Sequence, residues 1–247
     1  MMKIAVIGAA GRMGSKVVEA AEAAGDVEVV ARIDTADGFD REWPPETQAA
    51  IDFSHHGAAP RHAALAAAAR IPYIVGSTGL DAAEQAAVEE AARSIPVVQS
   101  ANFSLGVNVL AQLVEEAARI LGGEYDIEIV EMHHRRKRDA PSGTALMLSR
   151  AAAQGRSAAG CAPLRPVFGR HGETGERPGD EIGVHAVRGG GVFGDHTAVF
   201  AGEHERIELV HRAQDRAVFA AGALRAARWA LAAKPGLYSM RDVLARG

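Results

Sequence analysis

The chain has 247 residues and a formal net charge of −4, with 48% hydrophobic and 23% charged residues. This composition is ordinary for a globular protein and allows one large domain or two smaller ones. The acidic balance argues against a dedicated nucleic-acid binder, and no apolar run is long enough to span a membrane. Cys161 is the single cysteine. We therefore expect no internal disulfide and, with no signal or transit peptide evident, a cytoplasmic location.

The N-terminal part has the order strand, glycine loop, helix that a dinucleotide-binding fingerprint requires. An apolar run at residues 3–8 leads into the loop Gly8–Gly14, and a helical run follows at residues 15–24. The spacing is G-x-x-G-x-x-G, because Ala10 occupies the position of the usual second glycine. Such a loop alone is also typical of a plain strand-to-helix turn. The predicted second strand, 27–33, adds support because it ends at Asp34, whose carboxylate can accept hydrogen bonds from ribose hydroxyls.

The next part of the chain alternates short β runs with alanine-rich helices. We expect strands at residues 50–53, 72–75 and 95–98, and helices at residues 58–70 and 81–93. This alternation predicts an α/β domain with a Rossmann-like, doubly wound parallel sheet and a ligand at the carboxyl ends of the strands. Two loops, at residues 76–79 and 100–103, follow strands at that edge. Taken alone, each loop is equally consistent with a simple turn.

A second domain is predicted to begin at Leu105. It contains helices at residues 105–121 and 142–154, a strand at residues 127–133, and strands at residues 182–188, 192–201 and 205–212. We expect these strands to form a mixed, largely antiparallel sheet in an α+β domain. Residues 155–177 are rich in Gly, Pro and Ala, which predicts a loop with mobility or poor order. Asp195, His196 and His211 lie in the predicted strands, and we expect them to be satisfied structural polar groups.

The segment Glu131–Thr144 carries most of the candidate chemistry. It reads Glu-Met-His-His-Arg-Arg-Lys-Arg-Asp-Ala-Pro-Ser-Gly-Thr and lies between a predicted strand and a predicted helix. Ser142 occupies the position of a helix N-cap. The backbone N–H groups of Gly143 and Thr144 would then point outward with the positive end of the helix dipole, where a carboxylate or phosphate binds readily. A titratable cluster at a strand end would therefore face an anion-binding helix start.

Lys137 is unusual because only four of the 27 basic residues of the chain are lysines. Arginine keeps its proton in proteins, whereas lysine can be tuned to release it. We therefore predict that Lys137 is a proton donor and that its arginine neighbours supply a positive field. A basic run alone would favour a solvated loop or a nucleic-acid patch. The paired histidines before it and the Pro-Ser-Gly-Thr sequence after it favour an active site.

The ungapped pattern His-His-x-x-Lys-x-Asp-Ala-Pro-Ser-Gly-Thr-Ala at residues 133–145 resembles the signature of the dihydrodipicolinate reductase (4-hydroxy-tetrahydrodipicolinate reductase) family. The glycine loop is similar to that family's Gly-x-x-Gly-Arg-Met-Gly, and the resemblance spans essentially the whole chain. It implies NAD(P)H-dependent reduction of 4-hydroxy-tetrahydrodipicolinate, through the dihydrodipicolinate imine, in diaminopimelate and lysine biosynthesis. It also implies a dinucleotide-binding domain of residues 1–104 and 214–247, a substrate-binding and tetramerisation domain of residues 105–213, and a homotetramer.

The resemblance assigns roles to individual residues. His133 matches the family's proton donor or acceptor, and Lys137 matches a second proton donor. The residues that would bind a small dicarboxylate substrate are His134, Ser142, Gly143 and Thr144. The residues that would bind the cofactor are Gly8, Ala9, Ala10, Gly11, Arg12, Met13, Asp34, Gly76, Ser77, Thr78, Ser100, Ala101, Asn102 and Phe103. Ser77 stands where threonine is usual, which keeps the hydroxyl, and no metal site is implied.

The residues that follow the second predicted strand bear on the choice between NADH and NADPH. Asp34 is followed by Thr35, without the arginine that NADP-preferring members of the family carry there, so we expect NADH. Use of NADPH stays open, because a 2′-phosphate could still bind one of the arginines at positions 12, 32 and 41.

Three other functions compete with this interpretation. Another Rossmann-fold oxidoreductase acting on an amino or oxo acid would share the first domain, so only Glu131–Thr144 discriminates against it. A semialdehyde dehydrogenase, which is one oxidoreductase of this kind, would need a cysteine nucleophile, and Cys161 lies in no such context. A non-catalytic dinucleotide-sensing module would have no need for a titratable lysine at position 137. A nucleic-acid binder would show strongly salt-dependent affinity.

Overall fold

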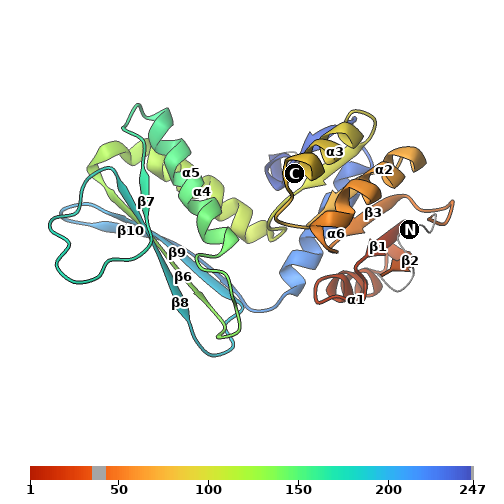
Figure 1. Cartoon of the computed structure of the whole chain (residues 1–247), viewed down its shortest axis with the longest axis horizontal. Helices are drawn as coiled ribbons and strands as arrows, with labels where there is room; N and C mark the ends of the chain where they lie inside the picture. The colour runs from red at the N-terminus through yellow and green to blue at the C-terminus, as the bar shows by residue number, and fades with distance from the viewer. Residues whose placement is uncertain (35–42, 246–247) are drawn as a thin grey trace. The chain divides into compact units, whose positions relative to one another are not determined.

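The structure, a computed structural model, describes residues 1–34 and 43–245. The chain divides into two compact units (Figure 1). The first unit comprises Met1–Leu105 and the C-terminal segment from Arg216, and the second comprises Gly106–Asp215. The first unit is therefore discontinuous in sequence.

The first unit is built on a parallel sheet, which among the described residues has six strands in the order β11-β5-β4-β3-β1-β2. Their bounds are β1 Met2–Ile7, β2 Val27–Ile33, β3 Ala49–Asp52, β4 Tyr73–Val75, β5 Pro96–Gln99 and β11 Gly236–Tyr238. The central strands are buried at consecutive positions rather than alternate ones, because helices cover both faces of a parallel sheet. The predicted doubly wound parallel sheet is confirmed.

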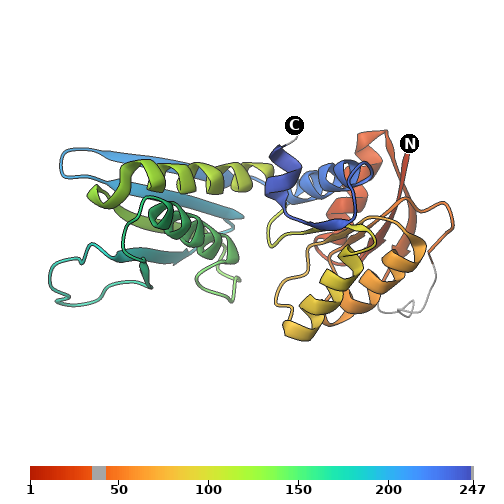
Figure 2. The same cartoon turned by 90° about the horizontal axis from the view of Figure 1, so that it is seen from above.

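Two separate cores flank this sheet. Helices α1 (Gly14–Ala24), α6 (Ala217–Ala230) and α7 (Met240–Ala245) pack against one face, and α2 (Ala59–Ala69) and α3 (Ala82–Ala92) pack against the other. Figure 2 shows the two groups of helices on opposite sides of the strands. The short helix η2 (His56–Ala58) leads into α2. The C-terminal segment adds β11 beside β5, a strand that the sequence pattern did not predict.

The second unit contains a mixed sheet in the order β10-β9-β6-β8-β7. Its strands are β6 Asp126–His133, β7 Arg165–Val167, β8 Glu181–Arg188, β9 Gly194–Ala201 and β10 Arg206–Ala213. The expectation of a mixed sheet is confirmed, and its pairings are divided evenly between the two senses: β6 pairs in parallel with β8, and β8 with β7. Only β9 pairs antiparallel with β6 and β10. The chain crosses over between β6 and β8 through a helix, and such a crossover returns it in the same direction.

Helices α4 (Leu105–Leu121) and α5 (Gly143–Ala158) cover one face of the mixed sheet (Figures 1 and 2), and η3 (Gly122–Glu124) follows α4. The inward residues of β6 alternate with outward ones, so that Ile127 and Ile129 are buried under the helices while Val130 is exposed. Further along β6, the same inward face carries Glu131 and His133 in place of apolar residues. The face of the sheet that carries the core therefore also carries the candidate catalytic residues.

The prediction of a loose loop at residues 155–177 is wrong in part. Helix α5 continues through Gly155, because a glycine there lets α5 approach α4 closely. A Cβ at Gly155 would lie 2.1 Å from the backbone oxygen of Glu115. Further on, Arg177 donates hydrogen bonds to Asp126 and Glu128 at 2.6 and 2.9 Å. Specific tertiary contacts that leave no periodic signal therefore fix this segment.

Candidate active site

The candidate catalytic cluster forms where β6 and β8 end and β9 begins. In the register of the sheet, His133 lies opposite Arg188, and Glu131 lies opposite His196. Glu131, His133 and His196 are 0%, 8% and 3% exposed. The imidazole rings of His133 and His196 meet edge to face with centroids 5.1 Å apart. Three strands thus bring together groups that lie as much as 65 positions apart in the sequence.

Glu131 lies at the centre of this cluster. Its Oε2 is 2.6 Å from Nδ1 of His133 and accepts a hydrogen bond from the guanidinium of Arg188 at 2.7 Å. Its Oε1 accepts hydrogen bonds from the same guanidinium at 2.8 Å and from the backbone N–H of Ser142 at 3.0 Å. Because an ionised carboxylate is only an acceptor, the proton of neutral His133 sits on Nδ1.

Ser142 is the N-cap of α5, as predicted from the sequence. Its Oγ accepts a hydrogen bond from the backbone N–H of Ala145 at 3.2 Å and lies 3.1 Å from Nε2 of His196. His196 was expected to be a satisfied structural group, and this expectation is wrong in part. It joins the helix start to the catalytic cluster, and its buried Nδ1 has no hydrogen-bond partner among the described residues.

The loop between β6 and α5 positions the remaining predicted residues. Nζ of Lys137 lies 2.8 Å from the carboxylate of Asp139, and the backbone N–H of Lys137 donates to the carbonyl of His134 at 3.0 Å. Nδ1 of His134 is buried and has no hydrogen-bond partner in the described part of the chain. Gly143 begins α5 in open space, since a Cβ placed on it would meet no atom within 4 Å.

Burial and charge set the protonation states of the cluster. Burial opposes ionisation of Glu131, but hydrogen bonds from Arg188 and His133 outweigh it and hold the pKa of the carboxyl below its usual value. Burial also lowers the pKa of His133, and the Glu131 carboxylate opposes that shift. Burial, with a smaller contribution from His133, lowers the pKa of His196 to about 3. His196 is therefore neutral near pH 7.

In the first unit, the glycine loop has the tight geometry expected between β1 and α1. Gly8 has a φ of +75°, a conformation that glycine adopts at little cost. A Cβ on Gly14 would lie 2.0 Å from the backbone oxygen of Gly8, and a Cβ on Gly8 would lie 2.9 Å from that of Phe53. The backbone N–H of Gly11 donates to the oxygen of Gly8 at 2.9 Å. These contacts leave no room for a Cβ at Gly8 or Gly14.

Phe53, which follows β3, joins the loops at the carboxyl edge of the parallel sheet. A Cβ on Gly76 would lie 2.2 Å from its ring, and the ring meets Phe103 edge to face at 5.6 Å. Ser77 donates a hydrogen bond from Oγ to the backbone oxygen of Ser54 at 3.1 Å. The structure thus gathers the glycine loop and the two later loops predicted from the sequence at one edge, with Phe53 as a contact that the sequence did not reveal.

Asp34 also belongs to this edge. Its two carboxylate oxygens accept hydrogen bonds from the backbone N–H of Ala10 at 2.9 and 3.1 Å, which ties the end of β2 to the glycine loop. Arg12 is exposed, and Arg32 is paired with Glu22 at 2.8 Å. The other two positions considered for cofactor choice, Thr35 and Arg41, lie outside the described residues.

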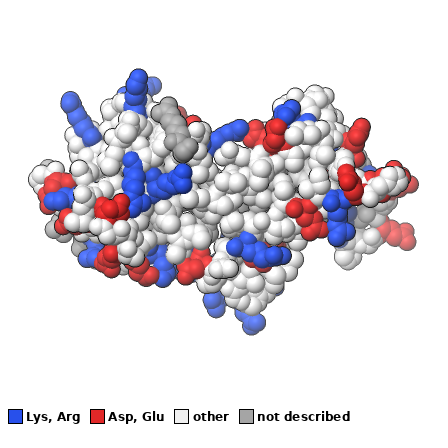
Figure 3. All heavy atoms as spheres, turned by 180° about the vertical axis from the view of Figure 1, so that it is seen from behind, with Lys and Arg blue, Asp and Glu red and all other residues white. Residues whose placement is uncertain are grey.

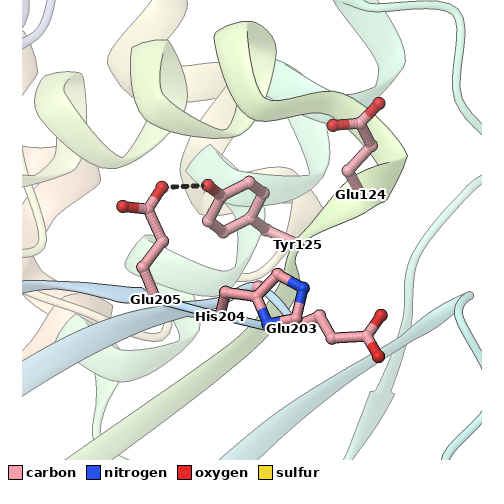
Figure 4. A pocket seen from close by; sticks show the side chains of 6 residues that line it. Glu124, Tyr125, Glu203, His204 and Glu205 are labelled. Atoms are coloured by element: carbon pink, nitrogen blue, oxygen red, sulfur yellow. Dashed lines mark hydrogen bonds between the residues drawn. The ribbon is translucent and has the colours of Figure 1, made fainter.

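A separate pocket of about 420 Å³ lies at the opposite end of β6, around the turn between β9 and β10 (Figure 4). It is lined by Glu124, Tyr125, Gly202, Glu203, His204 and Glu205. The pocket has three carboxylates and no Lys or Arg, so it would repel a dicarboxylate.

Among the described residues, no group of three or more His, Cys, Asp or Glu side chains could hold a metal ion. In the face shown in Figure 3, acidic and basic side chains are interspersed.

Comparisons with known proteins agree over the whole chain. The family model for the N-terminus of dihydrodipicolinate reductase matches residues 2–103, and the model for the C-terminus matches residues 106–244. The 4-hydroxy-tetrahydrodipicolinate reductase of Anaeromyxobacter dehalogenans is 45% identical, and the match covers 99% of this chain and 98% of the relative. The chain belongs to the dihydrodipicolinate reductase family. The enzyme of the same name from Caldanaerobacter subterraneus is 44% identical, and both chains are fully covered.

Solved structures bear on the fold alone. A dihydrodipicolinate reductase from Paenisporosarcina sp. TG-14 with dipicolinate bound has a TM-score of 0.78 at 23% identity and covers 98% of this chain and 99% of its own. A DAP dehydrogenase from C. glutamicum has a TM-score of 0.55 at 13% identity, with 99% and 98% covered. No described helix of this reductase is long and apolar enough to cross a membrane. The predicted family, fold class and NAD(P)H-dependent reductase activity are confirmed, and the residue roles stay predictions.

Sequence reasoning missed three members of this reductase's cluster: Glu131, Arg188 and His196. Glu131 offered one local signal, because it precedes His133 by two residues on a strand and therefore points to the same face. Arg188 and His196 gave no local signal. Their roles depend on how β8 and β9 pair with β6, and that pairing becomes known only with the fold.

Proposed function

We propose that this chain catalyses the reduction of 4-hydroxy-tetrahydrodipicolinate, through the dihydrodipicolinate imine, to tetrahydrodipicolinate in the diaminopimelate and lysine pathway, with NADH as the preferred reductant. The observation that supports this proposal most strongly is the hydrogen-bonded cluster of Glu131, His133, Ser142 and His196 beside Lys137. The first unit would bind the dinucleotide, and the second unit would bind the substrate.

Features of the helix start support binding of a doubly anionic ring. Gly143 is the first residue of α5 and lies in open space, so one substrate carboxylate would accept hydrogen bonds from the N–H groups of Gly143 and Thr144. Nδ1 of His134 is buried and has no hydrogen-bond partner among the described residues. The ring of His134 is partly exposed, so a substrate oxygen would contact it on the side away from Nδ1.

Two groups would handle the proton of the reaction. Reduction of the conjugated imine adds one hydride and one proton to the substrate, and the reduced nicotinamide supplies the hydride when it is bound. His133 directs Nδ1 to Glu131, which leaves Nε2 to donate or accept a proton at the substrate. Lys137 carries an ammonium that would favour negative charge developing on the ring and then release a proton to it. Asp139, paired with Lys137, would hold the ammonium in place until substrate binds.

The residues of the first unit fit a dinucleotide. A pyrophosphate must approach the backbone of the glycine loop closely, and Gly8, Gly11 and Gly14 present no side chain to it, with little room for a Cβ at any of the three. Asp34 follows β2, and its carboxylate would accept hydrogen bonds from the ribose hydroxyls. A 2′-phosphate there would meet a carboxylate, so we propose NADH over NADPH. Titration should give an NADH dissociation constant no higher than that for NADPH, and a markedly lower constant for NADPH would contradict this preference.

Product analysis with a labelled cofactor tests the activity. Freshly generated 4-hydroxy-tetrahydrodipicolinate is mixed with the enzyme and NADH that carries deuterium at the transferred position of the nicotinamide. We expect NADH oxidation to match tetrahydrodipicolinate formation, with one deuterium in each product molecule. Oxidation of NADH without deuterium in that product would overturn the proposal. So would turnover of a simple oxo acid while the dicarboxylate remains unreacted, which is the outcome expected for another amino-acid or oxo-acid dehydrogenase.

A further inference from the structure

We propose that Glu131 is a positioning residue, which holds His133 in one tautomer and couples it to the start of α5. This inference rests on the proposed function, because it assigns Glu131 a task in the same reaction. Glu131 would act through His133 and Ser142 without touching the substrate.

The hydrogen bonds of Glu131 exclude a direct catalytic role. An ionised carboxylate has about four lone-pair directions for accepting hydrogen bonds. Glu131 accepts from His133, twice from Arg188, and from the backbone of Ser142, all at 2.6–3.0 Å. Its side chain is 0% exposed. With its acceptor capacity filled and no exposed surface, Glu131 has nothing left to offer a substrate.

The same contacts explain what Glu131 does to His133. The carboxylate keeps the neutral imidazole protonated at Nδ1, so that Nε2 is the atom available for proton transfer. It also stabilises the imidazolium that forms when Nε2 takes a proton, as a buried carboxylate beside a catalytic histidine does elsewhere. The charged groups facing His133 from the packed elements are Glu131, Lys137, Arg188 and the titratable ring of His196. Glu131 is the anion among them.

Glu131 also links the histidine to the helix start. Its Oε1 holds the backbone of Ser142, the N-cap of α5, while Arg188 bridges from Glu131 to the backbone oxygen of Asp139 at 2.7 Å. A shift of the carboxylate would therefore move the proton-transfer group and the carboxylate-binding N–H groups together. We expect loss of Glu131 to affect both kcat and KM.

A matched control lies three residues upstream on the opposite face of β6. Glu128 also contacts a histidine, His185, at 2.7 Å and accepts hydrogen bonds from Arg170 and Arg177. Burial opposes its ionisation, but these partners lower its pKa to about 2. Glu128→Gln removes a carboxylate that is likewise paired with a histidine and with arginines from the same strand, although a half-buried one, without touching His133. It therefore reports the structural cost of losing such a charge.

The experiment compares wild type, Glu131→Gln and Glu128→Gln by ¹⁵N NMR of histidine and by the pH dependence of kcat. In wild type we expect neutral His133 to carry its proton on Nδ1. In Glu131→Gln we expect the pKa of His133 and the corresponding limb of the kcat profile to move to lower pH by at least about one unit, because a neighbouring anion is lost. We also expect kcat at neutral pH to fall at least about tenfold. Glu128→Gln should leave the pKa of His133 and the corresponding limb of the kcat profile unchanged.

Two results would overturn the inference. One is a wild-type His133 protonated on Nε2 in its neutral form, which needs no variant and so does not depend on folding of Glu131→Gln. The other is a Glu131→Gln protein that folds and shows the wild-type pKa at His133. Both are read by NMR without turnover, so they are distinguishable from failure of the reductase assay, which would overturn the proposed function alone.

Discussion

His133 has a different environment on each side of its ring. Nδ1 faces the carboxylate of Glu131, whereas a Cβ on Gly194 would lie 2.9 Å from Nε2. The glycine at the start of β9 therefore keeps the reactive side of the imidazole accessible. His196, two residues further along β9, completes the enclosure and connects to Ser142. His133 would exchange protons during turnover, whereas His196 stays neutral.

The neutral, buried state of His196 predicts a pH dependence of stability. Its pKa is about 3 in the folded protein, against an ordinary value of 6.5, so between these values the unfolded chain binds a proton that the folded chain does not. The contribution is fully present above pH 6.5 and is lost as the pH falls towards 3. We expect acidification from pH 7 to 5.5 to lower the free energy of unfolding by about 1 kcal/mol through this group.

Urea unfolding at both pH values would measure this change. His196→Gln should show a pH dependence smaller by about that amount, whereas replacement of His204, an exposed histidine in the turn between β9 and β10, should leave the dependence unchanged. Equal pH dependence in wild type and His196→Gln would show that His196 is not held neutral.

The sequence could predict the residues of the site that lie in one segment, because a strand end, an N-cap and a titratable pair are local patterns. His133, Lys137 and Ser142 belong to this class. Arg188 and His196 come from other strands, and their partners depend on register, which a single sequence does not determine. The local motif was therefore predictable, and the hydrogen bonds that orient it were not.

Helix α5 also has one part that the sequence predicts and one part that it does not. Its start was predictable from Ser142, but its end was not, because Gly155 normally signals the end of a helix. In the structure Gly155 lies inside α5 and against α4, where close approach of two backbones requires the absence of a side chain. The short strands β7 and β11, of three residues each, likewise depend on neighbours that the sequence pattern does not reveal.

The contact between α4 and α5 predicts the effect of Gly155→Ala. Alanine favours an isolated helix by about 1 kcal/mol over glycine, but here its Cβ would meet the backbone of Glu115. We expect the clash to outweigh the propensity and to lower stability by about 1–3 kcal/mol. Gly143→Ala, in open space on the same helix, is the control and should not show this loss. Thermal unfolding measures both variants, and a Gly155→Ala protein as stable as wild type would contradict the packing argument.

Within the second unit, no helix among the described residues covers the outward face of the mixed sheet. Three valines from three strands lie on this outward face: Val130, Val187 and Val210. Their exposed fractions are 38%, 43% and 42%. Exposed β-branched residues on an open sheet are typical of an interface between subunits. We therefore propose that this face assembles the homotetramer expected from the sequence.

Light scattering after size exclusion tests this assembly. The wild-type protein should have four times the mass of one chain, and Val130→Asp should give a smaller species, because a carboxylate buried in an apolar interface is costly. Ile120→Asp, an exposed apolar position on α4 away from the open face, is the control and should keep the wild-type mass. A monomeric wild type, or a tetramer unaffected by Val130→Asp, would contradict the proposed interface.

The most direct test of the central claim is single-turnover reduction of the dicarboxylate imine by wild type, His133→Ala, Lys137→Ala and Lys137→Arg, with NADH binding measured in parallel. Arginine keeps the positive charge of Lys137 but cannot release its proton. We predict that all three variants bind NADH like wild type and reduce the imine at least about 10²-fold more slowly, with Lys137→Arg recovering only the part of the rate that the positive charge supplies. Wild-type rates in both His133→Ala and Lys137→Ala, with NADH binding intact, would contradict the account.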